Sequence, residues 1–97
     1  MAHVVVASYR SKPGREADVA EHLRATIAPA RAEPGCEAYR VVRAKNDAAS
    51  FVQLESYADE ESFETHKDSR HFEGHIRNGA RNLIDSREVV IGDDVQD

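Results

Sequence analysis

The segment of residues 3–10 (HVVVASYR) constrains the fold most, because it is rich in valine and apolar on both of its alternating faces. Successive side chains of a β-strand point to opposite faces of a sheet, so this pattern indicates a strand that is covered on both sides. The chain has 97 residues, which is enough for one hydrophobic core and too few for two. We therefore expect residues 1–97 to form a single domain, with an acidic tail from about residue 92.

An amphipathic helix is predicted after this strand. Val19, Leu23 and Ile27 recur at helical spacing within a charged segment, which gives the helix one apolar face. Pro29 should kink or end the helix, because proline lacks the backbone N–H that a helix interior uses.

Two further strands are predicted in the middle of the chain. Residues 36–43 and 50–57 are rich in residues that favour strands, and the polar residues 44–49 lie between them. This arrangement indicates a β-hairpin.

The second half of the chain predicts two helical segments and a last strand. Asp59 and Ser69 can each cap a helix, and Phe72 and Ile76 lie on one stripe of the second helix. Residues 86–91 are expected to form the last strand. The order of elements indicates an α+β fold of the ferredoxin-like βαββαβ type, with an antiparallel four-stranded sheet.

The predicted sheet has apolar residues on both faces, although both helical layers should lie on the same face. In the third strand, Val52 and Leu54 point to one side, and Phe51 and Tyr57 point to the other. A face without helices would expose an apolar patch. We therefore expect a homodimer in which two sheets pack face to face.

Composition excludes several classes of function. The formal net charge is -5 and no cluster of Lys or Arg is present, so we expect no nucleic-acid partner and favour a small neutral or weakly polar ligand. No apolar run approaches the length of about 20 residues that crosses a bilayer, so we expect no membrane partner. The absence of a basic leader and the lone Cys36 favour a cytoplasmic protein.

Glu55 is the first candidate catalytic residue. It lies in phase with Phe51 and Tyr57, so a carboxyl group is placed on a largely covered face of the sheet. Burial raises the pKa of a carboxyl group, which suits a general base near neutral pH. Alternatively, Glu55 pairs with Arg40 or Arg43, or lies in water at the margin of the sheet.

Three of the five histidines, His66, His71 and His75, lie within ten residues of one another. His71 and His75 are four residues apart and share one helical stripe, from which they can reach a pocket under the helix. Histidine changes charge near neutral pH, which suits proton transfer. Alternatively, His71 and His75 are half-exposed helix residues, and His66 makes a structural hydrogen bond across the break before Ser69.

We predict neither a metal nor a bound cofactor. His71, His75 and Glu55 could supply three metal ligands, but the chain has no HExxH, no CxxC and no carboxylate cluster at ligand spacing. It also lacks a GxGxxG motif and a phosphate-binding loop.

Three motifs taken together resemble the antibiotic biosynthesis monooxygenase family. They are an E-P-G-C turn within residues 31–39, F-x-x-x-E-x-Y within residues 51–57, and H-x-x-S-x-H-F within residues 66–72, with Phe63 before it. The resemblance spans nearly the whole chain.

The resemblance implies a dimeric α+β barrel. Known members include cofactor-independent oxygenases of quinols and anthrone-like polyketides, haem-degrading enzymes and an isomerase of phosphorylated autoinducer-2. Haem degradation fits poorly, because Ile76 occupies the ligand position and the chain has no tryptophan. For an oxygenase, the resemblance implies Glu55, His66 and His71 as catalytic residues. The substrate-binding residues would be Phe51, Tyr57, Phe63, Ser69, Phe72 and His75.

The leading functional prediction is a cofactor-independent monooxygenase that oxidises a small phenolic, quinol or anthrone-like substrate with O2. An isomerase of a small hydroxy-ketone is the first alternative, because the same acid and base can move a proton without oxygen. The second is a non-enzymatic dimer that binds a small ligand.

Overall fold

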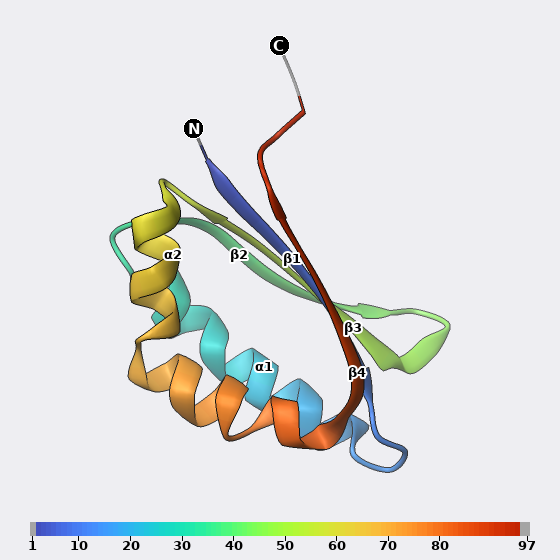
Figure 1. Ribbon diagram of the computed structural model, residues 1–97. Coiled ribbons are helices and arrows are strands. Elements are labelled where there is room, and N and C mark those ends of the chain that lie inside the picture. Colours follow the sequence, from blue (N-terminus) through green and yellow to red (C-terminus); the bar gives the residue numbers. More distant parts are fainter. Residues whose placement is uncertain (1, 96–97) are drawn as a thin grey trace.

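The computed structural model describes residues 2–95, which form four strands and the helices that connect them (Figure 1). The elements are β1 (His3–Ser11), α1 (Glu16–Arg31), β2 (Cys36–Ala44), β3 (Asp47–Tyr57), α2 (Glu60–Lys67), the short helical segments η1 (Phe72–Arg77) and η2 (Ala80–Leu83), and β4 (Ile84–Gly92). The strands pair antiparallel in the order β2-β3-β1-β4. The predicted α+β, ferredoxin-like fold is confirmed.

The helices cover one face of the sheet and leave the other open, as Figure 1 shows. Along β1, Val5 and Ala7 point toward the helices and are buried. Their partners across β3 are Glu55 and Gln53, which are buried on the same face. The core therefore lies between this face and the helices, and it includes polar side chains.

Helix α1 forms as predicted, with Val19 and Leu23 fully buried against the sheet. It continues through Pro29 and ends at Arg31, so of the two predicted effects of Pro29, a kink or an end, the end is wrong. Pro29 lies in the last turn, where its missing N–H removes one helical hydrogen bond. Burial of the next residue, Ala30, favours continuation of the helix at this point.

The hairpin between β2 and β3 is tighter than predicted. Residues 45–46 alone connect the two strands, whereas the sequence predicted a loop over residues 44–49. The carboxylate of Asp47 accepts a hydrogen bond of 2.8 Å from Arg10 on the neighbouring β1. Asp47 also pairs with Ala44 of β2, so β3 begins within the polar segment that was predicted to be a loop.

Both predicted helix caps are present. The side chain of Asp59 accepts the backbone N–H of Ser62 at 2.8 Å, at the start of α2. The hydroxyl of Ser69 accepts the N–H of Phe72 at 3.2 Å, at the start of η1. Segment η1 has the wider π-helical spacing, and β4 begins at Ile84, two residues before the predicted start.

The sheet face without helices carries a row of apolar residues, and we call it the open face. Leu54 in β3 keeps 38% of its surface exposed there, and Val90 in β4 keeps 66%. Val4 and Val6 of β1 and Val52 of β3 are half-buried on this face. Within residues 2–95, no helix has the length and apolar character needed to cross a bilayer.

Candidate active site

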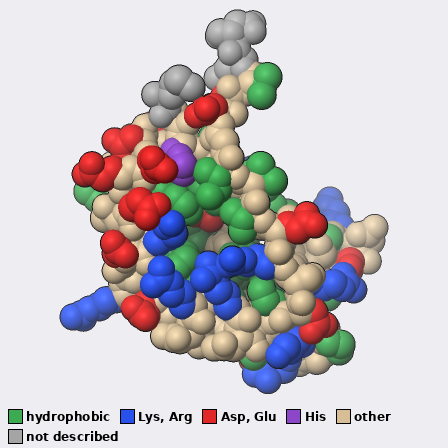
Figure 2. All heavy atoms as spheres, in the orientation of Figure 1, with side chains coloured by type: hydrophobic (Ala, Val, Ile, Leu, Met, Phe, Trp, Pro, Cys, Tyr) green, Lys and Arg blue, Asp and Glu red, His purple; other side chains and the backbone are tan. Residues whose placement is uncertain are grey.

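A cavity of about 290 Å³ lies between the helix-covered face of the sheet and the segments α2, η1 and η2. Figure 2 shows the hollow on this face, with hydrophobic side chains around it. The apolar part of its wall consists of Val5, Ala7, Phe63, Phe72, Val89 and Ile91. The sheet adds the polar side chains of Tyr9, Tyr39, Gln53 and Glu55. Lys67, Arg81 and Arg87 complete the wall, and a cavity of this size suits a small molecule with an apolar body and a few polar groups.

Glu55 lines the cavity from the middle of β3 and is 7% exposed. Its Oε1 accepts a hydrogen bond of 2.6 Å from the hydroxyl of Tyr57. Burial raises the pKa of Glu55 to about 7, and the charge of Glu33 acts in the same direction, while the bond from Tyr57 opposes the rise. Glu55 therefore exchanges a proton near neutral pH.

Neither arginine considered as a partner of Glu55 makes that contact. Arg43 donates a hydrogen bond to the carbonyl of Glu16, and its guanidinium lies 4.7 Å from the centre of the Phe51 ring. Arg40 is exposed on β2. The ion pair and the solvated margin weighed for Glu55 are both wrong, because Glu55 points into the interior.

His66 of α2 lies behind Glu55 and is 1% exposed. Its Nδ1 is 2.9 Å from a carboxylate oxygen of Glu33, and its Nε2 is 3.8 Å from Oε1 of Glu55. Because a carboxylate only accepts hydrogen bonds, we assign the Nδ1 proton to the bond with Glu33, which leaves Nε2 facing Glu55. Burial lowers the pKa of His66, while Glu33 opposes this effect.

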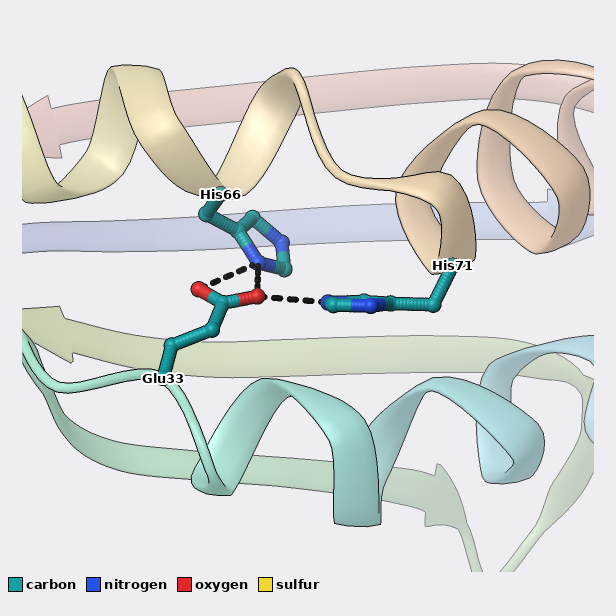
Figure 3. A group of neighbouring side chains, drawn as sticks. All are labelled: Glu33, His66 and His71. Atoms are coloured by element: carbon teal, nitrogen blue, oxygen red, sulfur yellow. Dashed lines mark hydrogen bonds and ion pairs between the residues drawn. The ribbon is translucent and has the colours of Figure 1, made fainter.

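His71 contacts the same carboxylate from the other side. Its Nε2 lies 2.5 Å from Oε2 of Glu33, and Figure 3 shows Glu33 between the two imidazole rings. His71 and Glu33 are 18% and 14% exposed at their side chains. The contacts Glu55–His66–Glu33–His71 thus run from the cavity to the surface.

The hydrogen bond predicted across the helix break exists, but it uses the backbone of His66. The hydroxyl of Ser69 donates to the His66 carbonyl at 2.6 Å, which leaves the imidazole of His66 free to bond Glu33.

Glu33 is the member of this cluster that the sequence did not single out as a functional residue. It lies in the turn between α1 and β2, where Glu33-Pro34-Gly35 was interpreted as a turn alone. Its place in the E-P-G-C motif was the available signal.

A second polar network was also missed. The hydroxyl of Tyr9 donates to Gln53 at 2.6 Å, and the amide of Gln53 donates to the hydroxyl of Tyr39 at 2.7 Å. All three residues line the cavity. Burial raises the pKa of Tyr9 to about 12 and also raises the pKa of Tyr39, so both hydroxyls stay protonated at neutral pH.

The structure does not bring all of the predicted substrate-binding residues to the cavity. Phe63 and Phe72 line it, and Tyr57 contacts Glu55 from within the core. Phe51 packs instead in the core near α1, and His75 faces α1, where its Nδ1 lies 3.3 Å from Nδ1 of His22. Phe51 and His75 therefore lie outside the cavity wall, and so does Ser69, which caps η1.

One group of side chains has the donor atoms of a metal site. One ligand atom from each of Glu33, His66 and His71 lies within 4.8 Å of the others. Two imidazole nitrogens and a carboxylate oxygen are ligands that zinc accepts. The set weighed from the sequence, with His75 and Glu55, is not assembled, because His75 faces His22. The hydrogen bonds of Glu33 account for the cluster without an ion.

A comparison with protein families identifies the family of this chain. A family model described as antibiotic biosynthesis monooxygenase matches residues 2–78. The chain belongs to the antibiotic biosynthesis monooxygenase family. The matched segment spans β1 to η1 and includes Glu33, Glu55, His66 and His71, whereas η2 and β4 lie beyond it.

Solved structures agree with this assignment. The protein PA3566 of Pseudomonas aeruginosa has 25% identity and a TM-score of 0.91, with 98% of this chain and 95% of that chain covered. A structure described as an antibiotic biosynthesis monooxygenase has 25% identity, a TM-score of 0.89 and coverage of 97% and 99%. A conserved protein of Methanosarcina mazei Go1 has 26% identity, a TM-score of 0.86 and coverage of 95% and 91%. No functionally curated protein matches the chain.

Proposed function

We propose that this protein is a monooxygenase that oxidises a small phenolic, quinol or anthrone-like substrate with O2 and without a bound cofactor. The observation that carries the proposal is the position of Glu55, a carboxyl group with a pKa of about 7 in the wall of a largely apolar cavity. Such a group removes a proton at neutral pH from an acidic C–H or O–H.

The reaction of an anthrone-like substrate shows what the site must do. Ionised Glu55 removes a proton from the substrate CH2 group, and the resulting carbanion transfers one electron to O2. The two radicals combine into a peroxide, which takes a proton on its outer oxygen. Loss of the second proton from the same carbon breaks the O–O bond and gives a ketone and water. The CH2 group loses four electrons and O2 accepts four.

The contacts behind Glu55 suit the proton transfers. His66 presents Nε2 to Glu55 at 3.8 Å, and a shift of about 1 Å brings the two groups to hydrogen-bond distance. Glu33 holds the imidazole through Nδ1, and His71 connects Glu33 to the surface. In this proposal Glu55 is the base, while His66, Glu33 and His71 carry its proton to solvent.

The cavity wall suits an aromatic substrate. Phe63 and Phe72 offer ring contacts, and the hydroxyl of Tyr39 is positioned by Gln53. A fixed hydroxyl donor stabilises negative charge on the oxygen of a phenolate or enolate better than bulk water does, because it needs no reorientation.

We also propose that the protein is a homodimer that buries the open face. The support is the row of Val6, Leu54 and Val90, which pair across β3, β1 and β4 without a helix above them. A second sheet packed face to face removes this apolar surface from water.

Oxygen uptake with a panel of quinols and anthrones tests the proposed function. We expect uptake with at least one of them and a product with one oxygen atom from 18O2, detected by mass spectrometry. Glu55→Gln should reduce the rate about 10²- to 10⁴-fold, the usual contribution of a general base. His75→Gln is the matched control, because His75 lies outside the cavity wall. Equal rates for wild type and Glu55→Gln would contradict the proposal.

An isomerase of a small hydroxy-ketone is the second candidate. The observation that favours it is again the pKa of Glu55, since a group with a pKa of about 7 both takes and returns a proton at neutral pH. Conversion of a hydroxy-ketone without O2, lost in Glu55→Gln, would support this function over the monooxygenase.

A further inference from the structure

The mouth of the cavity carries positive charge, in contrast to the chain as a whole. The formal net charge is -5, yet the charged residues of the cavity wall besides Glu55 are Lys67, Arg81 and Arg87. Figure 2 shows Lys and Arg side chains gathered beside the hollow. The overall charge favoured a neutral ligand, whereas this local arrangement favours an anion.

Within the described residues, Arg81 and Arg87 lack acidic partners, whereas Lys67 has one. Lys67 forms an ion pair of 2.9 Å with Glu64. For Arg81 and Arg87, no carboxylate of residues 2–95 lies within ion-pair distance. The Nε of Arg81 is shielded from solvent and has no hydrogen-bond partner in that part of the chain. A buried donor without a partner costs free energy, which a bound acceptor would recover.

A third arginine, Arg77, contacts the same aromatic ring as Arg81. The guanidinium groups of Arg77 and Arg81 lie 5.2 and 5.3 Å from the centre of the same ring, that of Phe72. Burial and the charges of Arg87 and Arg77 lower the pKa of Arg81 below its ordinary value. The charges of Arg87 and Arg77 therefore disfavour the charged form of Arg81, and a bound anion would offset this repulsion.

The positions of Arg87 and Glu55 along the sheet indicate how far apart the two ends of a ligand must be. Arg87 is paired with Tyr9 across β1 and β4, whereas Val5, the partner of Glu55, is paired with Ile91. Four residues of an antiparallel strand span about 13 Å, so the cationic mouth and Glu55 lie at different levels along the sheet. A molecule that contacts both places its reactive group and its charged group at opposite ends.

We infer that the substrate of this site is a small aromatic or enolisable molecule with an anionic group, a carboxylate or a phosphate, which Arg81 and Arg87 bind at the cavity mouth while the reactive end meets Glu55. The planar guanidinium donates two parallel hydrogen bonds to either anion. The inference rests on the proposed function for the role of Glu55. Both arginines follow residue 78, so the family match does not include them.

Binding measurements test this inference without turnover. Isothermal titration calorimetry with 2-naphthoate, 2-naphthyl phosphate and the neutral methyl 2-naphthoate compares two anions with an uncharged analogue of similar size. We expect at least one anion to bind wild type about tenfold or more tightly than the ester, with a preference that weakens at higher salt. The tighter of the two anions identifies carboxylate or phosphate as the natural group.

Arg87→Gln and Arg81→Gln should each reduce the preference severalfold and leave ester binding unchanged. Arg15→Gln is the matched control, because it removes the same charge from an exposed residue on the loop before α1. Arg87 is exposed, so Arg87→Gln tests the inference even if Arg81→Gln fails to fold. Equal affinity of wild type for anions and ester, or an unchanged preference in the folded Arg87→Gln variant, would overturn it.

Two further readouts separate this inference from the proposed function and from an acidic partner. Retained anion preference in Glu55→Gln supports the inference even if no oxygen uptake is found. If Arg87→Gln alters the sedimentation coefficient of the protein and leaves ligand preference intact, the arginines pair with another protein chain and the inference is wrong.

Discussion

Nε2 of His66 lies 3.8 Å from Oε1 of Glu55, which places an imidazole directly behind the carboxyl group of the cavity wall. The other nitrogen of His66 is held by Glu33, so the ring has one fixed orientation. This arrangement couples a buried acid to a neutral histidine within a short distance of a cavity. Its consequences can be measured in the pH dependence of stability and of the reaction rate.

Glu55→Gln should change how stability depends on pH. The pKa of Glu55 is raised from 4.5 to about 7 on folding, so between these values the folded state binds more protons than the unfolded state. Stability contributed by protonated Glu55 is fully present below pH 4.5 and is lost as pH rises through about 7. Over this range the free energy of unfolding of wild type should fall by about 3 kcal/mol relative to Glu55→Gln.

Urea unfolding followed by circular dichroism at pH 4.5, 6 and 8 measures this difference. The lowered pKa of His66 has the opposite effect on stability, but His66 is present in both proteins and its contribution largely cancels in the comparison. Parallel stability curves for the two proteins would show that Glu55 titrates normally.

Glu33→Gln should move the pH–rate profile. The negative charge of Glu33 raises the pKa of Glu55, so its removal lowers that pKa and ionises the base at lower pH. If Glu55 is the base, the rate rises with pH through its pKa, and the acidic limb of the profile should shift to lower pH. Glu21→Gln, which removes an exposed carboxylate on α1, should leave the profile in place. A lower rate without any shift would indicate a purely structural role for Glu33.

Gly35→Ala should destabilise the start of α2. A Cβ atom on Gly35 would lie 2.0 Å from Oγ and 2.3 Å from Cβ of Ser62, so the first turn of α2 would have to move. We expect a loss of about 1–3 kcal/mol in the free energy of unfolding, as for other overpacked contacts. Adding Ser62→Gly should recover part of this loss, measured by a double-mutant cycle. Gly74→Ala, where a Cβ meets no atom within 4 Å, should show no such loss.

Leu54→Arg should convert the proposed dimer to a monomer. Leu54 lies on the open face, with Val6 of β1 and Arg40 of β2 as its strand partners. A further guanidinium buried there without an acidic partner is costly in an interface. Sedimentation velocity should give a dimer for wild type and a monomer for Leu54→Arg. Val95→Arg is the control, because Val95 is fully exposed beyond β4. A wild-type monomer at micromolar concentration would contradict the proposed dimer.

The fold could be predicted from local patterns. The alternation of residues 3–10, the helical spacing of Val19 and Leu23, and the caps at Asp59 and Ser69 each depend on neighbours within a few residues. The boundaries that were wrong depend on distant contacts. Asp47 pairs with Ala44 across the hairpin, and its carboxylate also bonds Arg10, 37 residues away.

The candidate site was also predictable only in part. Period-two alternation alone places Glu55 on the covered face of β3, which the structure agrees with. The alternation does not reveal that Phe51, on the same face, packs near α1 rather than at the cavity. Different helices cover different parts of β3, and the alternation does not indicate which helix covers which residue.

The sequence by itself determined the order and type of the strands and helices, apart from their ends, and which face of β3 carries Glu55, because these properties follow from local chain geometry. Only the tertiary structure decided the partners of Glu55. Glu33 meets His66 across 33 positions and His71 across 38, since the turn after α1 lies against the break between α2 and η1. It also decided that Arg81 and Arg87 lie at the mouth of the cavity. Proximity of this kind arises from the packing of whole elements, and no pattern along the chain contains it.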